Sequence, residues 1–574
     1  MRAAVAFVRG RPELGLLLVL TLATRLWGIG WGLPASDGWD NDGIAPRDAL
    51  AGLVETFTPG HHFTYPPVHL ALVALLSLPV WLPPLLRLPS LDPDVVVPAL
   101  LDPQIMTGVA YVARFITVAM SLGCVLLTYR LAERAGNRAG AFVAGLFAAL
   151  GGAYVYYGHT TNLDTAQLFW SLLAYHFFLD AVARKAPERL TRVALVSVIG
   201  VCTKDQAYGA FILTWPIAVA AWALSCADLR RRIAVSAARG TLVAVVAYGF
   251  LSSAFVNPTG FRERVKFLIG PASQDSALYT KDLASRLQIL RDIAHQFPMF
   301  YPWPALGLCV LGLGSTAVMA VWWLRARGPR GAFIPVVFAR LLPLLGFVSF
   351  TITFNLSARR FEPRFLLLQY TALAIYAGIG AAAVVSSRGA ARLLGALLAF
   401  APAPGLVYIA LSVDLSLAFD PRYDVEAYFA RDLAPGTLVE TYGQNVYLPR
   451  FPKHLRVQRV STDTQKNPMP GIVEITASPA LAKARGAQVV VFSEGWAWRY
   501  SEPQPEAGVR GRIPPKGVNE TAKDPEGRAF FRTLFDGNNP DYALAYTAEP
   551  RDGFFGCYRI HSATCMRTYV FRAR

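Results

Sequence analysis

The stretch LGLLLVLTLATRLWGIGWGL, residues 14–33, is long and apolar enough to cross a bilayer as one helix. Arg2, Arg9 and Arg11 precede it, and the acidic sequence WDNDG, residues 39–43, follows it. Because basic residues favour the cytoplasmic side of a membrane, we expect the N-terminus in the cytoplasm and the acidic sequence on the far side. The stretch lacks a small-residue cleavage site, so we interpret it as an uncleaved anchor.

The composition of the whole chain supports a membrane protein. The 574 residues are 54% hydrophobic and only 16% charged, whereas soluble domains carry about 25% charged residues. The net charge of +17 lies largely in short loops between apolar runs and is not pooled in one patch. We therefore predict an integral membrane protein, which we expect in a bacterial inner membrane, and no nucleic-acid binding.

The alternation of apolar runs and basic loops predicts about eleven membrane-spanning helices. An odd number places the residues after 412 opposite the N-terminus, outside the cytoplasm. A further apolar run, 65–88, would break the alternation if it crossed, and its prolines disfavour a regular helix, so we interpret it as a juxtamembrane or re-entrant element on the outer side. The predicted spans are 14–33, 106–130, 139–157, 165–183, 191–203, 207–226, 239–256, 302–324, 333–356, 365–386 and 391–412.

Two domains are predicted along the chain. Residues 1–412 form an α-helical transmembrane domain, with one outer loop at 34–104 that carries juxtamembrane helices and a second at 257–300. Residues 413–574 are more polar, carry Gly and Pro throughout and contain the strand-like run 489–493. These features predict an extracytoplasmic α/β domain.

Smaller features are predicted within the C-terminal domain. We expect a helix over 423–433, a strand over 437–442 and a long mobile loop over 500–528, which is rich in Pro, Gly, Glu and Lys. Cys557 and Cys565 lie close together in the sequence, on the side of the membrane where disulfides persist. We therefore predict a disulfide between them.

Four polar clusters lie on the predicted outer face. Outer loops are normally poor in Lys and Arg, so three arginines within six residues indicate an anionic ligand. A carboxylate can take a proton from a hydroxyl as a general base, and basic side chains can hold a phosphate and stabilise the charge that grows on it as it leaves. The clusters are Asp37, Asp40 and Asp42; His159, Asn162 and Asp164; Lys204 with its neighbours in TKDQ, 203–206; and Arg359, Arg360, Glu362 and Arg364.

Structural roles are open for several of these residues. Asp42 is also placed to cap a helix that begins at Ile44, and Asp164 to cap the fourth span, since Asp is a favoured N-cap residue. Lys204 at the end of a span is also typical of a snorkelling lysine. His159 is more often a hydrogen-bond partner within the protein than a ligand.

The order of these motifs gives a resemblance. Asn41-Asp42-Gly43, Tyr65-Pro66-Pro67-Val68, Asp164, Gly200-Val-Cys-Thr-Lys204 and Glu362-Pro363-Arg364-Phe365 follow one another as do motifs of the GT-C superfamily of membrane glycosyltransferases. Over about residues 14–412 the chain resembles the group that contains protein O-mannosyltransferases and the lipid A aminoarabinose transferase, glycosyltransferase family 39. It departs from that group at Gly43, which stands where the family has a glutamate.

The resemblance implies a function and assigns roles to residues. It implies a polyprenyl-phosphate sugar as donor, a hydroxyl of a lipid, glycan or protein as acceptor, and transfer on the extracytoplasmic face with inversion. Asp42 is then the general base, with Asp40 as the alternative because of Gly43, and Asp164 positions the acceptor. A divalent cation, Mg²⁺ or Mn²⁺, would be held by Asp42 and Asp164, and its use is left open. The phosphate contacts are Lys204, Arg364, Arg359 and Arg360, and the further substrate contacts are His159, Asn162, Tyr65 and Glu362.

A second hypothesis comes from another class of protein. In a polytopic transporter or flippase for a lipid-linked sugar, basic outer loops and intramembrane charges would serve binding without reaction. Transporters often carry paired repeats and interrupted helices, and the sequence contains no such repeat. Together with the acidic outer loop and the C-terminal domain, this favours an enzyme over a transporter, and over a non-catalytic partner in a glycan-assembly complex.

Overall fold

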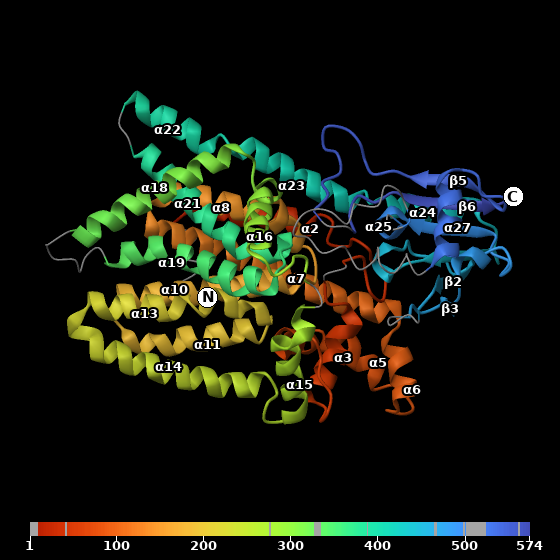
Figure 1. The fold of residues 1–574 in the computed structure, drawn as a ribbon, viewed down its shortest axis with the longest axis horizontal. Helices are drawn as coiled ribbons and strands as arrows, with labels where there is room; N and C mark the ends of the chain where they lie inside the picture. The colour runs from red at the N-terminus through yellow and green to blue at the C-terminus, as the bar shows by residue number, and fades with distance from the viewer. Residues whose placement is uncertain are drawn as a thin grey trace. The chain divides into compact units, whose positions relative to one another are not determined.

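The computed structural model describes residues 10–574, except 41–42, 275–276, 326–333, 387–388, 464–467, 498–499, 501–523 and 561–562. The chain divides into two compact units (Figure 1). The first comprises Met1–Trp27, Asp48–Leu76 and Ala113–Ala410, and the second Gly28–Arg47, Ser77–Val112 and Leu411–Arg574. The C-terminal residues from Leu411 onward are therefore grouped with two segments from the predicted first outer loop.

Helices make up most of the described chain. In chain order they are α2 (Pro12–Leu26), α3 (Pro46–Phe57), α4 (Pro67–Leu76), α5 (Leu78–Leu85), α6 (Pro93–Leu100), α7 (Pro103–Ala135), α8 (Arg138–Leu150), α9 (Gly152–Tyr157), α10 (Leu163–Ala183), α11 (Leu190–Val201), α12 (Tyr208–Phe211), α13 (Thr214–Ser225), α14 (Arg230–Leu251), α15 (Pro258–Ile269), α16 (Leu283–His295), α17 (Phe297–Phe300), α18 (Pro304–Arg325), α19 (Ile334–Phe350), α20 (Leu356–Ala358), α21 (Leu367–Val385), α22 (Ala390–Phe400), α23 (Ala403–Ala418), α24 (Pro421–Asp432), α25 (Glu494–Ala497) and α27 (Pro525–Phe535).

The helical membrane fold is confirmed, with fewer full-length spans than predicted. Among the described residues, eight helical segments are long and apolar enough to cross a membrane. Each of the eleven predicted spans contains a helix, but α2, α8 and α11 have only 15, 13 and 12 residues. The expected span 14–33 is cut short because Gly28 and Gly32 adopt positive φ angles of 86° and 72°, which no regular α-helix contains.

The run 65–88 forms a bent pair of short helices. α4 and α5 meet at an angle of 71° around Ser77, and Pro83 and Pro84 lie inside α5. A bend of this size is typical of a broken span or a re-entrant loop. The structure therefore agrees with the expectation that this run does not form one regular helix.

Helix α21 lies in the most buried of the candidate spans, Pro363–Val385. Of the apolar stretch of this span, 94% lies inside the protein. Small residues let its neighbours approach closely. A Cβ at Gly140 of α8 would lie 2.3 Å from the carbonyl oxygen of Gly378, and one at Gly312 of α18 would lie 1.8 Å from that of Tyr376. Glycine contacts of this kind stabilise helix pairs in membranes by close backbone packing, and they hold the helix that follows the motif 359–364.

The C-terminal residues form the predicted α/β domain around a six-stranded sheet of order β3-β2-β1-β4-β6-β5. Strands β1 to β4 pair in parallel, whereas β6 and β5 join as antiparallel strands at one side. Val490 and Phe492 of β4 pack with Phe531 of α27, and Val489 and Val491 pack with residues of α24. The strands are β1 (Leu438–Tyr442), β2 (Arg456–Ser461), β3 (Val473–Thr476), β4 (Val489–Ser493), β5 (Tyr542–Ala548) and β6 (Thr568–Ala573).

The predicted details of this domain have different outcomes. Helix α24 and strands β1 and β4 occupy the expected positions, and Cys557 and Cys565 form the expected disulfide. β4 is a continuous apolar run because helices cover both faces of the sheet. The expected loop 500–528 falls mostly outside the described residues.

Candidate functional site

Lys204 and Asp164, two predicted site residues, form a buried ion pair. Lys204 follows α11 and is 4% exposed, and its Nζ lies 2.5 Å from Oδ2 of Asp164, which is 3% exposed. Such a pair is stable only if both charges stay matched, because removing one partner leaves an uncompensated buried charge. The snorkelling alternative for Lys204 does not hold, since its ammonium group points to Asp164.

The start of α10 shows why Asp164 is available for this pair. The side chain of Asn162 accepts a hydrogen bond from the backbone N–H of Asp164 at 2.8 Å and is the N-cap of the helix. Asp164 therefore lies in the first turn and does not cap the helix, which corrects the capping alternative. A carboxylate in the first turn is also favoured by the helix dipole.

Phe365 gathers three basic groups around its ring. The guanidinium carbons of Arg360 and Arg364 lie 4.8 Å and 4.7 Å from the ring centroid, and Nζ of Lys204 lies 5.2 Å from it. Cations over an aromatic face are attracted by the ring quadrupole. The two motifs around Lys204 and around residues 359–364 thus meet at one point.

Glu362 partly neutralises this group of cations. Its carboxylate oxygens lie 2.6 Å from a terminal nitrogen of Arg360 and 2.7 Å from one of Arg364. With the pair between Lys204 and Asp164, three cations face two carboxylates. Counted over these described residues, the positive charges exceed the negative ones by one, which suits a site for an anion.

The three cations line a cavity of about 440 Å³, here called the Lys204 cavity. Tyr65 from the Pro-Pro motif, Asp205 and Tyr208 also line it. Asp164, Glu362, His159 and Asn162 are not among its described lining residues, so the first two act on this cavity through the cations that they bind.

Arg264 and Phe365, which were not predicted as site residues, support the Lys204 cavity: Arg264 binds Asp205 in its wall, and Phe365 lines it. Arg264 of α15 is buried, lies 2.5 Å from the carboxylate of Asp205 and donates to the carbonyl oxygen of Phe63 at 2.7 Å. The signal in the sequence is that Arg264 lies with Arg262 and Lys266 in the loop 257–300, which is expected on the outer side, where basic residues are uncommon. The role of Phe365 had no separate sequence signal, because an aromatic residue at a helix start is common.

Asn257, just before α15, forms hydrogen bonds with the turn at residues 58–61, which precedes Tyr65 in the chain. Its Nδ2 donates to the carbonyl oxygens of Thr58 and His61, at 2.8 Å and 2.6 Å, while its Oδ1 accepts from the backbone of Gly60 and Gly260. A side chain that uses both donor and acceptor in this way fixes the turn in one conformation. The contact joins two distant segments of the first unit on one side of the cavity.

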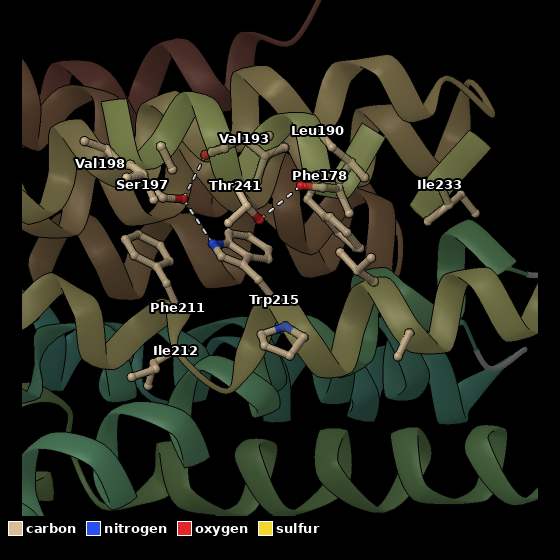
Figure 2. Close-up of a pocket in the computed structure, with 18 of the residues that line it drawn as sticks. Phe178, Leu190, Val193, Ser197, Val198, Phe211, Ile212, Trp215, Ile233 and Thr241 are labelled. Carbon is tan, nitrogen blue, oxygen red and sulfur yellow. Dashed lines mark hydrogen bonds between the residues drawn. The ribbon is translucent and has the colours of Figure 1, made fainter. Parts of the chain in front are cut away.

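A second cavity, of about 790 Å³, is apolar and lies among α10 to α14. Tyr208 lines both this cavity and the Lys204 cavity. Figure 2 shows Phe211, Trp215 and Val193 around the apolar space. We call it the apolar cavity.

The few polar atoms of the apolar cavity are satisfied within the protein. Nε1 of Trp215 donates to Oγ of Ser197 at 3.0 Å, and that hydroxyl donates to the carbonyl oxygen of Val193 at 2.8 Å (Figure 2). The hydroxyl of Thr241 likewise donates to the carbonyl oxygen of Ala237 at 3.1 Å. The space therefore suits a hydrocarbon rather than a polar ligand.

The predicted acidic cluster belongs to the second unit. Asp37 pairs with Arg47 at 3.1 Å and accepts a hydrogen bond from Asn445; burial raises the pKa of its carboxyl, although the charge of Arg47 opposes that shift. Asp37 thus serves the packing of this unit. Asp40 is half-buried next to the buried Trp39, and Asp42 lies outside the described residues. The helix expected to begin at Ile44 begins at Pro46, so Asp42 does not stand directly before it and the capping alternative is wrong.

His159 has contacts of a structural kind. Its Nδ1 and Nε2 each lie 2.6 Å from a backbone carbonyl oxygen, of Val155 and Trp27 respectively. Both ring nitrogens therefore face oxygen atoms of the protein. These contacts tie the turn before α10 to the end of α2.

The described residues do not fit a metal site. Among them no group of three or more His, Cys, Asp and Glu side chains is placed to hold a metal ion. Asp164 is occupied by the ammonium group of Lys204, which would repel a divalent cation. Asp42, the other residue named for a divalent cation, lies outside the described residues.

Comparisons with known proteins give similar structures only. No protein-family model and no curated protein matches the sequence. The apo oligosaccharyltransferase of Archaeoglobus fulgidus is similar at a TM-score of 0.48 and 12% identity, over 94% of this chain and 80% of that chain. ArnT from Cupriavidus metallidurans is similar at a TM-score of 0.47 and 14% identity in its apo state, over 89% of this chain and 97% of that chain. The same ArnT bound to undecaprenyl phosphate has a TM-score of 0.45 and 13% identity over 97% of both chains.

Proposed function

We propose that this chain is a membrane glycosyltransferase that moves a sugar from a polyprenyl-phosphate donor to a hydroxyl acceptor on the extracytoplasmic face, with inversion. The observation that carries the proposal is that a cationic cavity and an apolar cavity share Tyr208. A polyprenyl phosphate has the same two parts, an anionic head and a hydrocarbon chain. A soluble nucleotide sugar has no use for the apolar part.

In this proposal the Lys204 cavity binds the phosphate of the donor. Lys204, Arg360 and Arg364 offer donors around the Phe365 ring, and their positions are set before the substrate arrives. Preorganised cations stabilise the negative charge that develops on the leaving phosphate without further rearrangement. Asp164 and Glu362 are positioning residues, because they orient these cations through ion pairs.

The apolar cavity receives the first isoprene units of the donor. Burial of hydrocarbon contributes about 0.8 kcal/mol per CH₂ group. Ordering of the lipid chain in the cavity also fixes the direction in which the phosphate enters the Lys204 cavity. This orientation lowers the entropy cost of bringing the sugar to its acceptor.

The transfer step needs a base for the acceptor hydroxyl. The acceptor oxygen attacks the anomeric carbon, the bond from that carbon to the phosphate oxygen breaks, and the hydroxyl proton passes to a carboxylate. The products are the glycosylated acceptor and the polyprenyl phosphate. We assign the base to Asp42, with Asp40 as the alternative, and the acceptor to a lipid, glycan or protein hydroxyl.

The test is a transfer assay with the purified protein in lipid. Radiolabelled polyprenyl-phosphate sugars are offered with a membrane extract as acceptor, and the variants Asp42→Asn and Asp40→Asn are compared with Asp228→Asn, which changes an exposed aspartate in the first unit. We expect transfer to be lost in Asp42→Asn and kept in Asp228→Asn. Loss in Asp40→Asn alone would move the base to Asp40. Donor binding without transfer to any acceptor would contradict the enzyme and favour a flippase.

A further inference from the structure

A third cavity lies beside the Lys204 cavity, has a volume of about 460 Å³ and is also basic. We call it the Arg286 cavity. Lys281, Arg286 of α16 and Arg359 line it, and Gln274 and Ser357 line both cavities. Arg359 was expected to share the phosphate site with Arg360, but the structure places the two neighbouring side chains in different cavities.

The charges of the Arg286 cavity are not balanced. In the Lys204 cavity each cation lies within 2.7 Å of a carboxylate oxygen. In the part of the chain that the structure describes, none of Lys281, Arg286 and Arg359 lies within ion-pair distance of a carboxylate. Three basic groups around one cavity, with no ion pair to a described acidic residue, create a positive potential that attracts an anion.

Asp282, the acidic neighbour of Lys281 in the sequence, has other partners. Its carboxylate accepts hydrogen bonds from the hydroxyls of Thr280 and Ser285 and from the backbone N–H of Ser285, and so caps α16. The hydrogen bond from Thr280, followed by those from Ser285, holds the pKa of Asp282 well below its usual range. The negative charge of Asp282 thus stabilises the helix start.

Arg359 is held in place before any ligand binds. Its backbone is left-handed, with φ of 53°, and ends α20. Its Nε donates to Oε1 of Gln274 at 3.0 Å and its Nη1 to the carbonyl oxygen of Tyr279 at 2.5 Å. Two of its three nitrogens anchor the guanidinium, which leaves Nη2 for an anion.

Helix α16 carries an exposed apolar ridge next to this cavity. Leu283, Leu287 and Leu290 are 72%, 60% and 41% exposed, and their spacing of four and three residues places them on one face. Arg286 and Arg291 are exposed on the same helix. An amphipathic helix with leucines on one face and arginines beside them is typical of a helix that lies in a membrane interface.

We infer that the Arg286 cavity binds the phosphate of an anionic membrane lipid, while the leucines of α16 lie among its acyl chains. The cations supply the attraction for phosphate, and the apolar ridge distinguishes a lipid-borne phosphate from a free one. This site shares Gln274 and Ser357 with the donor site but none of its cations, and lipid binding here does not depend on sugar transfer. Its effect is to hold α16, and with it Arg359 beside the residues 360–364, at the membrane surface.

The test measures lipid binding by the purified full chain in detergent. Fluorescent phosphatidylglycerol and phosphatidylcholine are titrated onto the protein and onto the double variant Lys281→Gln/Arg286→Gln. We expect phosphatidylglycerol to bind about tenfold or more weakly to the double variant, since each basic residue near an anionic lipid surface contributes severalfold in affinity. Phosphatidylcholine should bind weakly to both proteins.

Two controls decide between sources of the phosphate and between sites. Arg231→Gln removes an exposed arginine that lines none of the three cavities, and Arg364→Gln removes one from the Lys204 cavity; both should keep phosphatidylglycerol binding. Inorganic phosphate at millimolar concentration should not displace the lipid. Unchanged binding in the double variant, equal loss in Arg231→Gln, or displacement by inorganic phosphate would each overturn the inference, whatever the result of the transfer assay.

Discussion

The Lys204 cavity and the Arg286 cavity are each lined by three basic side chains, but only those of the Lys204 cavity are paired with described carboxylates. In the first, the cations are paired with carboxylates, and Lys204 and Asp164 are almost fully buried. In the second, no carboxylate of the described residues pairs with them, and Lys281 and Arg286 are exposed to solvent. Buried charge needs a partner, whereas exposed charge is stabilised by water. A preorganised site thus differs from a surface that only attracts anions in the burial of its basic side chains and in their carboxylate partners, and not in the presence of Lys or Arg.

The largest change that we expect is in protein stability. Equal stability changes in the two cavities would contradict the difference between them. Asp164→Asn removes the carboxylate that lies 2.5 Å from the buried ammonium group of Lys204, so we expect the free energy of unfolding to fall by about 3–5 kcal/mol. Lys281→Gln, the matched change in the Arg286 cavity, should alter stability by about 0.5 kcal/mol or less, as exposed substitutions do. Thermal unfolding in detergent measures both.

A double variant separates charge matching from general damage at this position. Asp164→Leu/Lys204→Met removes both charges and should recover most of the stability that Asp164→Asn loses. If the double variant were as unstable as the single one, the ion pair would not be the reason for the loss.

The second effect concerns transfer. Lys204→Met removes a cation that faces the leaving phosphate, so we expect the rate of transfer to fall about 10²–10³-fold, the range found for loss of one preorganised donor. Lys281→Met should change it less than about twofold. Initial rates with a radiolabelled polyprenyl-phosphate sugar measure both, and equal losses would show that the two cavities form one site.

The smallest change that we expect tests whether the aromatic ring of Phe365 contributes to donor binding. Phe365→Leu keeps an apolar side chain but removes the ring that the three cations surround. A cation–π contact contributes about 0.5–2 kcal/mol, so we expect the donor KM to rise severalfold with the fold intact. Phe361→Leu, at the neighbouring aromatic position, is the control, and an equal rise there would contradict a specific role for Phe365.

Several parts of the fold followed from the sequence alone because they depend on local composition. Apolar runs of span length mark the helices, and the continuous apolar strand 489–493 marks a sheet covered on both faces. The disulfide between Cys557 and Cys565 was predicted because its partners are eight residues apart. Lys204, Arg360 and Arg364 were found as candidates because basic residues in loops expected on the outer side run against the usual distribution of charge.

The tertiary structure alone decided how these candidates combine. That Lys204 pairs with Asp164, and that Phe365 collects three cations, depends on contacts between segments far apart in the chain. Arg359 and Arg360 are adjacent in sequence, yet the left-handed backbone at Arg359 sends their side chains to different cavities. Hydropathy and charge patterns report on one segment and its surroundings, whereas the chemistry of a site depends on which distant side chains meet and on how deeply they are buried.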